Sequence, residues 1–382
     1  MRQRSRRELL KVGAGTALGL GGARLLAGCG HASPNSTSAT PAAAPVVTPA
    51  ACAHRTGVPT ARVAAARGTD LGEMTRMALA ALGGIGAVVH EGESVFVKPN
   101  MVTLPWASSS YNPFRLGECT KPEIVIAVVE ECLRAGAREV VVGDGSQMPR
   151  FDWSGAMTLD GSRNLAGEAA RLGAVYGRPV RLACLDVDTP EWIDVPTGTS
   201  LHSVAVSSLV ARADRVISIP VAKTHRWAYL TLALKNFIGI TPLARYGWGG
   251  QETSRVALHS NDPTPRGFGR LFVDIAHAVQ PDLALIDFSI GMEGNGPSQS
   301  AGGTPVDMRT RLGSWLVLAS TDPVAADATA ARVMGLEAPF APEILTMARD
   351  AGLGIMCEPS IELLGARLDD LRVRWTAAQP AV

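Results

Sequence analysis

The stretch that decides the fold is DRVISIPVAKTHRWAYLTLALKNFIGIT, residues 214–241. Its first apolar run, 216–222, ends abruptly at Lys223, and Lys235 then interrupts a second apolar run, 232–240. A continuous apolar run that ends in charge is typical of a buried strand that reaches the edge of a sheet. A lysine within apolar sequence is costly unless it is paired or faces a cavity, so we expect Lys235 to have a specific role.

Short apolar runs alternate with amphipathic segments along the rest of the chain. The apolar runs predict strands, and a period of about 3.6 residues predicts the helices between them. The predicted strands cover 62–66, 94–100, 138–146, 179–187, 215–225, 282–289, 314–320 and 360–365. The predicted helices cover 70–82, 120–137, 162–173, 266–280, 322–335 and 342–354. This order predicts a three-layer α/β fold, with a mostly parallel sheet and helices on both of its faces.

The first 29 residues indicate an export signal. Arg6 and Arg7 precede a weakly apolar segment, 12–27, which resembles a twin-arginine signal. The segment ends in LLAGC, which resembles a bacterial lipobox whose cysteine, Cys29, becomes the lipidated N-terminus. The alternative is an ordinary cleavage site with an incidental cysteine. The prediction is an exported, periplasmic or extracytoplasmic protein that is anchored in the membrane only by lipid at Cys29.

The rest of the chain is predicted to hold one folded domain. Residues 30–57 are rich in Ala, Pro, Ser and Thr, which predicts a disordered linker. A single α/β domain is expected over 58–375, followed by a disordered tail over 376–382. The segment 241–266 is polar, glycine-rich and without a clear period, which predicts a long loop or lid inserted into the domain.

The composition argues against several classes of function. A formal net charge of +1 gives no general attraction to nucleic acid or to an anionic membrane. None of the cysteines forms a CxxC pair, which argues against an iron–sulfur cluster or a structural zinc site. The chain also lacks the P-loop, GxSxG, HExxH and EF-hand patterns. The predicted partner is a small anionic ligand; the cofactor is left open, with a divalent metal as one candidate.

Polar side chains follow most of the predicted strands at the point where each strand ends. Ligands of open α/β sheets bind outside the carboxyl ends of the strands, so we expect these side chains to meet in one site. Lysines suit an anionic group, and carboxylates beside them suit a divalent cation or proton transfer. The predicted catalytic residues are His225, Asp144 and Lys235. The predicted substrate-binding residues are Lys98, Asn100, Ser146, Lys223, Thr224 and Asn236, and the predicted metal ligands are Asp287 and Asp322.

Each of these residues also has an ordinary structural explanation. A lysine after a strand is usually solvated, and Asp144 in the sequence GDGS can simply build a turn. Asp322 precedes Pro323 at the start of a predicted helix and can be only its cap. Asp327, inside that helix, can be a surface residue. His225 can be a base, a metal ligand or a hydrogen-bond donor, and the spacing does not choose among these roles.

Five segments resemble one known family in the same order along the chain. They are VFVKPNMV at 95–102, VVVGDGS at 140–146, ISIPVAKTHRWAYLTLALKNFIGI at 217–240, LALIDFSIGMEGNGP at 283–297 and DPVAADATAARVMG at 322–335. The chain thus resembles, over roughly residues 60–356, the family catalogued as domain of unknown function 362. The resemblance implies an α/β domain and the positions of a site, but no particular reaction. Some members carry a ferredoxin-like cluster domain, whose CxxC runs this chain lacks.

Three functions follow from these predictions. The first is an enzyme that acts on a small anionic substrate, with or without the help of a metal. The second is a membrane-tethered binding protein for an anionic small molecule or cofactor, which the lipobox and the linker favour. The third is a cofactor-dependent redox protein, because the twin-arginine route exports folded proteins, many of them loaded with cofactors.

Overall fold

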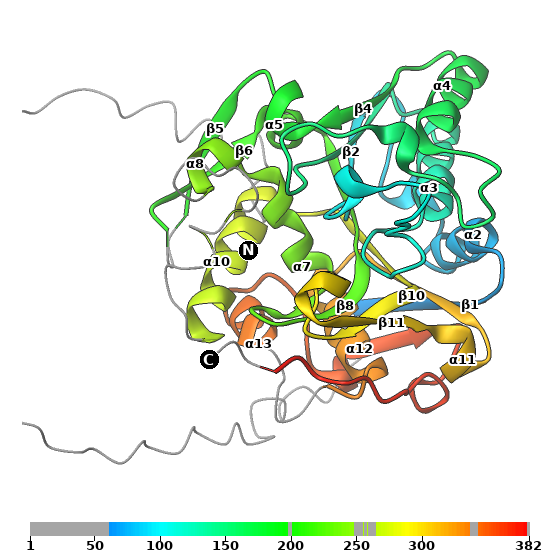
Figure 1. Ribbon diagram of the computed structural model, residues 1–382, viewed down its shortest axis with the longest axis vertical. Helices are drawn as coiled ribbons and strands as arrows, with labels where there is room; N and C mark the ends of the chain where they lie inside the picture. The colour runs from blue at the N-terminus through cyan, green and yellow to red at the C-terminus, as the bar shows by residue number, and fades with distance from the viewer. Residues whose placement is uncertain are drawn as a thin grey trace, which may run out of the picture.

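The computed structural model describes residues 61–197, 201–247, 255, 258, 265–336 and 343–379 (Figure 1). The predicted export signal and the predicted linker lie outside these residues. Most of the predicted loop or lid, 241–266, and the last three residues of the predicted tail also lie outside them. Within the described part, no helix combines the length and the apolar character that crossing a membrane requires.

A sheet of 11 strands forms the centre of the domain. Its central path runs in the order β13 (Ile361–Leu364), β1 (Ala61–Gly68), β12 (Trp315–Ser320), β10 (Leu283–Gly294), β7 (Arg215–Ile219), β2 (Ser94–Pro99), β3 (Glu139–Asp144) and β4 (Val180–Cys184). Along this path the pairings are parallel except for the two that β12 makes. The sheet is therefore mostly parallel, as predicted.

Further strands lie beside this path. β8 (Val221–His225) and β11 (Gly303–Asp307) pair with β10, and β9 (Tyr229–Thr231) pairs with β8. A separate antiparallel pair, β5 (Trp192–Pro196) and β6 (Ser203–Ser207), was not predicted from the sequence.

Helices cover both faces of the sheet, which gives the predicted three-layer α/β architecture. On one face α2 (Leu71–Ala81), α3 (Pro122–Arg134) and α4 (Leu165–Tyr176) pack in sequence. On the other face α10 (Pro265–Val279), α12 (Pro323–Val333) and α13 (Glu343–Asp350) pack together, and the short α7 (Ala233–Asn236) contacts α10 and α12. In Figure 1, α2, α3 and α4 lie on one side of the molecule and α7, α10 and α13 on the other.

Side-chain caps fix where several helices begin. Asp70 accepts the backbone N–H of Glu73 at the start of α2, and Asn164 does the same for Gly167 at the start of α4. Asp322 caps α12 by accepting the backbone N–H of Ala325. Such caps stabilise a helix by about 1 kcal/mol each because they satisfy N–H groups that the helix itself leaves unpaired.

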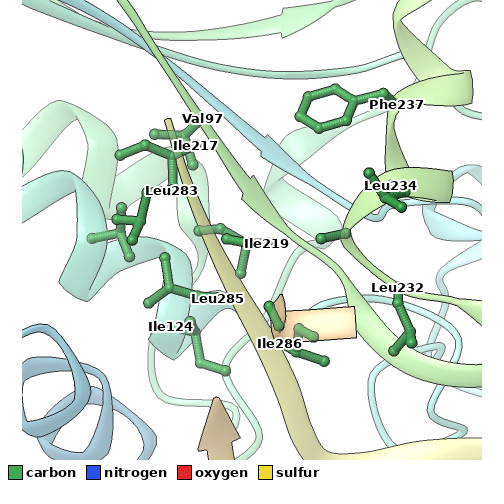
Figure 2. Close-up of a cluster of buried hydrophobic side chains, with 14 of the residues drawn as sticks. Val97, Ile124, Ile217, Ile219, Leu232, Leu234, Phe237, Leu283, Leu285 and Ile286 are labelled. Atoms are coloured by element: carbon green, nitrogen blue, oxygen red, sulfur yellow. The ribbon is translucent and has the colours of Figure 1, made fainter. Parts of the chain in front are cut away.

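Apolar side chains of the central strands and of the segment 232–240 share one core. Figure 2 shows Ile217 and Ile219 of β7 close to Leu283 and Leu285 of β10. Each of these side chains is at most 1% exposed, and burial of each stabilises the fold by about 1.5–3 kcal/mol. The second apolar run therefore folds as α7 followed by a 3-10 turn, η5 (Phe237–Ile240), and returns its apolar side chains to the core.

The predicted strand 215–225 is interrupted at Pro220. Proline has no N–H and so cannot donate to the ladder of a central strand. The Pro220 carbonyl still accepts the backbone N–H of Asp287 at 2.9 Å. Before Pro220 the chain pairs with β2 and β10 as β7, and after it the chain pairs with β10 and β9 as β8. The break carries Lys223 beyond the end of β2, where the candidate site lies.

Candidate anion-binding site

Three lysines that are far apart in the sequence meet in one cavity of about 90 Å³. Lys98 comes from β2, Lys223 from β8 and Lys235 from α7. None of the three is more than 7% exposed. Every predicted catalytic and substrate-binding residue except Thr224 lines this cavity, namely Lys98, Asn100, Asp144, Ser146, Lys223, His225, Lys235 and Asn236. We call this space the lysine cavity.

Lys98 and Asp144 form a buried ion pair in the wall of the cavity. The Lys98 ammonium lies 2.5 Å from Asp144 Oδ1 and also donates to the Pro99 carbonyl at 2.8 Å. Burial lowers the pKa of Lys98, and the Asp144 carboxylate opposes that shift. Asp144 Oδ2 accepts the backbone N–H of Met101 at 2.6 Å. Both carboxylate oxygens are thus engaged, so Asp144 serves as the counterion of Lys98 rather than as an open base.

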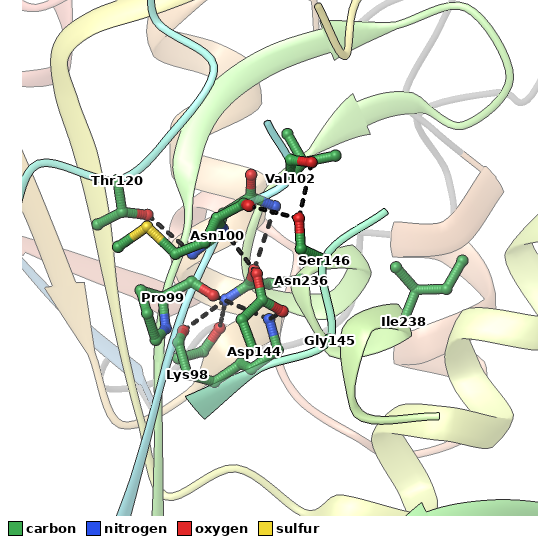
Figure 3. A network of polar contacts seen from close by, with 12 residues as sticks. Lys98, Pro99, Asn100, Val102, Thr120, Asp144, Gly145, Ser146, Asn236 and Ile238 are labelled. Carbon is green, nitrogen blue, oxygen red and sulfur yellow. Dashed lines mark hydrogen bonds and ion pairs between the residues drawn. The ribbon is translucent and has the colours of Figure 1, made fainter. Parts of the chain in front are cut away.

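A chain of amides connects Lys223 to the backbone of β2. The Lys223 ammonium donates to Asn100 Oδ1 at 3.0 Å and to the Glu118 carbonyl at 2.7 Å. Figure 3 shows the Asn236 side chain next to Asn100, where its Nδ2 donates to the Lys98 carbonyl at 2.7 Å. Neither acceptor of Lys223 is charged, and burial lowers the pKa of Lys223 to about 8.

Lys235 differs from the other two lysines of the cavity in its polar contacts. Within the described residues, its amine has neither a hydrogen bond nor an ion pair, and it lies 6.0 Å from the centre of the Phe272 ring. Burial lowers the pKa of Lys235, the neighbouring Lys223 and Lys98 act in the same direction, and together they bring the pKa to about 7. A charged ammonium is therefore disfavoured here, and the uncharged amine is present near neutral pH.

His225 lines the cavity in an orientation that suits a donor. Its Nδ1 accepts the backbone N–H groups of Trp227 and Ala228 at 3.2 and 3.3 Å. A neutral imidazole held in this way carries its proton on Nε2. The geometry therefore favours the donor among the roles that the sequence left open and disfavours the role of base.

Thr224 is the substrate-binding prediction that the structure does not support. Its side chain points away from the lysines, and its hydroxyl donates to the Gly294 carbonyl at 2.7 Å. The reason is the alternation of side chains along a strand: Lys223 and His225 of β8 share one face, and Thr224 between them points to the other.

Asp287 lies outside the cavity and holds a different lysine. Its Oδ2 accepts the backbone N–H of Lys121 at 3.0 Å and lies 3.4 Å from the Lys121 ammonium. Its Oδ1 accepts both the N–H and the hydroxyl of Ser289, at 2.9 and 2.6 Å. Asp287 thus acts as a buried structural anchor, and its oxygens are already satisfied by protein donors.

Asp322 lies at the opposite edge of the sheet from the lysines. Asp322 follows the end of β12, and β12 runs antiparallel to β10. Ser320, the last residue of β12, therefore pairs with Ala284 near the start of β10. Its oxygens cap α12 at Ala325 and accept the Ile355 N–H at 2.9 Å. Asp287 and Asp322 therefore do not come together as the predicted metal ligands. No group of three or more His, Cys, Asp or Glu side chains is placed to hold a metal in the part of the chain that the structure describes.

Several residues of the site were missed by the sequence analysis. Arg255, within the predicted lid, also lines the cavity and forms an ion pair with Asp186 at 2.8 Å. Thr231 lines it too, and its hydroxyl is buried without a hydrogen-bond partner among the described residues. Thr231 lies directly opposite Lys223 in the β8–β9 pairing, so the two side chains share one face.

Two glycines let the backbone close around the Lys98–Asp144 pair. The Gly145 N–H donates to the Gly239 carbonyl at 2.8 Å, which joins the end of β3 to the turn after α7. A Cβ at Gly239 would lie 2.3 Å from Asp144 Oδ1, and one at Gly145 would lie 2.4 Å from the Gly239 oxygen. Any other residue at either position would force these segments apart.

Comparison with solved structures gives only weak likenesses. The lactate racemase apoprotein of Thermoanaerobacterium thermosaccharolyticum matches with 12% identity and a TM-score of 0.34, over 61% of this chain and 50% of that one. A protein of Thermotoga maritima matches with 12% identity and a TM-score of 0.37, over 68% of this chain and 57% of that one. This chain thus spans half of the first protein and 57% of the second, and likenesses at these scores support no argument about function.

Sequence comparison gives a firmer result. A thylakoid-associated protein of Synechocystis sp. is 29% identical over 284 residues, which are 73% of this chain and 74% of that protein. A family model described as Domain of unknown function (DUF362) matches residues 95–332, which is more than half of the chain and includes every residue that lines the lysine cavity. The chain therefore belongs to the DUF362 family of domains of unknown function.

Proposed function

We propose that this domain is an enzyme that binds a small organic anion in the lysine cavity and acts on it with the amine of Lys235. The observation that carries the proposal is the convergence of three buried lysines on one cavity that supplies a single carboxylate partner, Asp144. Buried charge without a partner is costly, and proteins retain it mainly where a ligand or a reaction uses it.

The cavity can hold an anion through donors that the protein does not use. An ammonium group has three N–H donors. Lys98 and Lys223 each direct two of theirs to protein oxygens, which leaves one apiece for a ligand. The hydroxyl of Thr231 lies beside Lys223 and adds a neutral donor. The volume of about 90 Å³ suits a ligand of a few non-hydrogen atoms and is far below the ~300–1,000 Å³ of sites for drug-sized ligands.

Lys235 is better suited to react with the ligand than to bind it. A catalytic base works best when its pKa is near the working pH, and burial brings the pKa of Lys235 to about 7. The other two predicted catalytic residues are engaged: Asp144 with Lys98, and His225 Nδ1 with two backbone N–H groups. Lys235 is therefore the group that we expect to exchange a proton with the bound anion.

Thermal unfolding of the full-length protein with small anions tests the proposal. Acetate, lactate, pyruvate and phosphate at pH 7 are the probes, and an anion that fits should raise Tm by mass action. Lys223→Met should fold and lose that rise, whereas Arg309→Ala, in a different cavity, should keep it. No rise with any anion in the wild type, or an equal rise in Lys223→Met, would contradict the proposal.

The alternative is a binding protein that holds the anion without changing it. The engagement of Asp144 and His225 favours it, because two of the three groups expected to do chemistry are occupied by protein partners. Proton NMR of a binding anion, incubated with excess protein, separates the two functions. New product signals that depend on Lys235 indicate an enzyme, and recovery of the unchanged anion after the protein is removed indicates a binding protein.

We also propose that the domain is exported and held at a membrane by lipid on Cys29. The twin-arginine and lipobox patterns support it, as does the name of the thylakoid-associated relative. Cys357 is disulfide-bonded, which is typical of proteins in oxidising compartments. Cys29→Ala should release the protein from the membrane fraction; if that variant stays with the membranes to the same extent, lipid on Cys29 is not the anchor.

A further inference from the structure

Lysine is rare in this chain, and its placement is unusual. Only five of the 36 lysine and arginine residues are lysines. Lys11 lies outside the described residues, and the other four, Lys98, Lys121, Lys223 and Lys235, are all at most 7% exposed. The described surface therefore carries its positive charge on arginine. A guanidinium stays protonated in proteins, whereas a buried amine can become neutral and nucleophilic.

The four buried lysines differ in the polar partners of their amines. Lys98 pairs with Asp144, and Lys121 pairs with Asp287. Lys223 donates to an amide oxygen and to a backbone carbonyl. Lys235 has no hydrogen-bond or ion-pair partner among the described residues, and it faces the same cavity as Lys98 and Lys223. It is thus the lysine whose nitrogen is open to a ligand on the side where two cations can hold a carboxylate.

From this arrangement we infer that Lys235 forms a Schiff base with the carbonyl carbon of a small keto acid, whose carboxylate is held by Lys98, Lys223 and Thr231. The inference deepens the proposed function and rests on it. A cavity of about 90 Å³ suits a substrate of a few carbon atoms, with the carbonyl next to the carboxylate or one carbon away.

The step balances with groups that the cavity holds. The lone pair of the neutral Lys235 amine forms a bond to the carbonyl carbon, and the carbon–oxygen π bond breaks to give a carbinolamine. The carbonyl oxygen then leaves as water with the two hydrogens of the amine, and the carbon–nitrogen double bond forms. No oxidant, reductant or metal is consumed.

The surroundings of Lys235 favour this chemistry over simple charge pairing. Burial and the neighbouring cations lower the pKa of Lys235 to about 7, which keeps a large share of the nitrogen unprotonated at neutral pH. Desolvation and a nearby cation are the two means by which proteins activate lysine for attack on carbonyl compounds. A carboxylate beside Lys235 would have had the opposite effect, and the one carboxylate of the cavity wall is held by Lys98.

Reductive trapping tests the inference directly. The full-length protein is incubated at pH 7 with pyruvate, glyoxylate, acetoacetate or oxaloacetate and sodium cyanoborohydride, and the product is analysed by intact and peptide mass spectrometry. The expected result is one adduct, heavier than the protein by the mass of the keto acid less one oxygen atom, on the peptide that contains Lys235. The scarcity of lysine makes the background low, because the described surface has no lysine that competes.

Matched variants and a matched ligand separate the possible outcomes. Lys235→Arg keeps a cation at this position but cannot form the adduct. Lys235→Met provides a second check if the arginine does not fit. Each variant should lose at least nine-tenths of the labelling, and its Tm should show that it is folded. Lactate has the carboxylate but no ketone, so it should raise Tm without being trapped. A rise in Tm with lactate or pyruvate together with no adduct at Lys235 overturns the Schiff base and leaves the anion site standing. No rise in Tm with any of these anions overturns both.

Discussion

Two cavities of the described structure are each lined by several cations, and they differ in volume, in exposure and in ion pairing. The larger, about 510 Å³, is lined by Arg76, Arg115, Arg163 and Arg309 with Asp70, Glu123 and Asp160 among them. Its arginines are roughly half exposed, and Arg76, Arg163 and Arg309 each lie within ion-pair distance of a carboxylate. The lysine cavity is about 90 Å³, its cations are buried, and one of them has no partner among the described residues.

The contrast shows that neither volume nor charge alone distinguishes the candidate site from an ordinary surface hollow. Exposed ion pairs contribute only about 0–1 kcal/mol, and arginines around an open hollow are expected on a surface that uses little lysine. A buried amine without a counterion is unfavourable by itself, so it requires an explanation that an open arginine does not. If this contrast holds, changes to the buried groups should alter the free energy of unfolding far more than changes to the exposed arginines.

The largest effect is expected at Asp144. Asp144→Ala removes the counterion of Lys98 and leaves a fully buried ammonium beside two other lysines. Removing one partner of a buried ion pair typically costs about 3–5 kcal/mol. Urea unfolding at pH 7 measures the loss, and the double variant Asp144→Ala/Lys98→Met should recover most of it. A loss below about 1 kcal/mol would mean that the pair is solvated like the surface pairs.

A smaller effect is expected at Asp327, which positions α7. The sequence left Asp327 as a candidate surface residue, but it is buried, and its two oxygens accept the N–H groups of Ala233 and Leu234 at 2.7 and 3.0 Å. Asp327→Ala leaves these buried donors unpaired, at a cost of about 1–3 kcal/mol in unfolding at pH 6. Because α7 carries Lys235, this variant should also reduce the labelling of Lys235 in the trapping experiment.

The cost of Asp327→Ala should also depend on pH. Burial raises the pKa of Asp327 to about 7, so the folded state holds a proton that the unfolded chain has lost above about pH 4. The stability that Asp327 contributes is therefore lost as pH rises toward 7. Urea midpoints of both proteins from pH 4.5 to 7.5 should converge with rising pH; a constant gap would mean that Asp327 does not titrate in this range.

Lys235 should show the opposite dependence. Its pKa is lowered to about 7 in the folded state, while an unfolded lysine keeps its proton until about pH 10, so the unfolded chain binds more protons between these values. Stability of the wild type should rise with pH through this window, with a slope of up to ~1.4 kcal/mol per pH unit from one proton. Lys235→Met should lack much of that slope. Parallel curves for the two proteins between pH 7 and 9 would show that Lys235 has an ordinary pKa.

The smallest effect is expected in the larger cavity. Arg309 pairs with Asp307 and stacks at 4.5 Å on the ring of Trp315, but it is about half exposed. Arg309→Ala should therefore change the free energy of unfolding by no more than about 1 kcal/mol, and it should leave anion binding and Lys235 labelling as in the wild type. A loss of anion binding in this variant would transfer the site to the larger cavity.

The sequence predicted the lysine cavity because it lies where parallel strands end. Lys98 near the end of β2, Asp144 at the end of β3 and Lys223 in β8 follow apolar runs whose direction is shared, so their ends meet at one edge. Lys235 was predicted from the energetic cost of its apolar surroundings. These positions could be predicted because they depend on local sequence. An apolar run is buried as a strand, and a charged residue at its end lies at the edge of the sheet.

The same reasoning failed where a strand reverses direction. The run 314–320 is as apolar as the others, but β12 is antiparallel because the chain returns from β10 through β11 and one short helix, α11 (Met308–Leu312), without a long crossover helix. A single strand carries no mark of its direction, so Asp322 was placed at the wrong edge. Lys121 was missed for a different reason, since its buried partner, Asp287, is distant in the sequence; the scarcity of lysine was the signal that could have found it.

The scarcity of lysine also leaves the described surface without lysines that amine-directed reagents could modify. Acylating labels need an exposed neutral amine, and Lys98, Lys121 and Lys223, each at most 1% exposed, become accessible only when the structure around them opens. The rate at which each of these three lysines acquires label would therefore report how often the structure around it opens. Local opening around β2 and β8, which carry Lys98 and Lys223, could be measured in this way without introducing a probe.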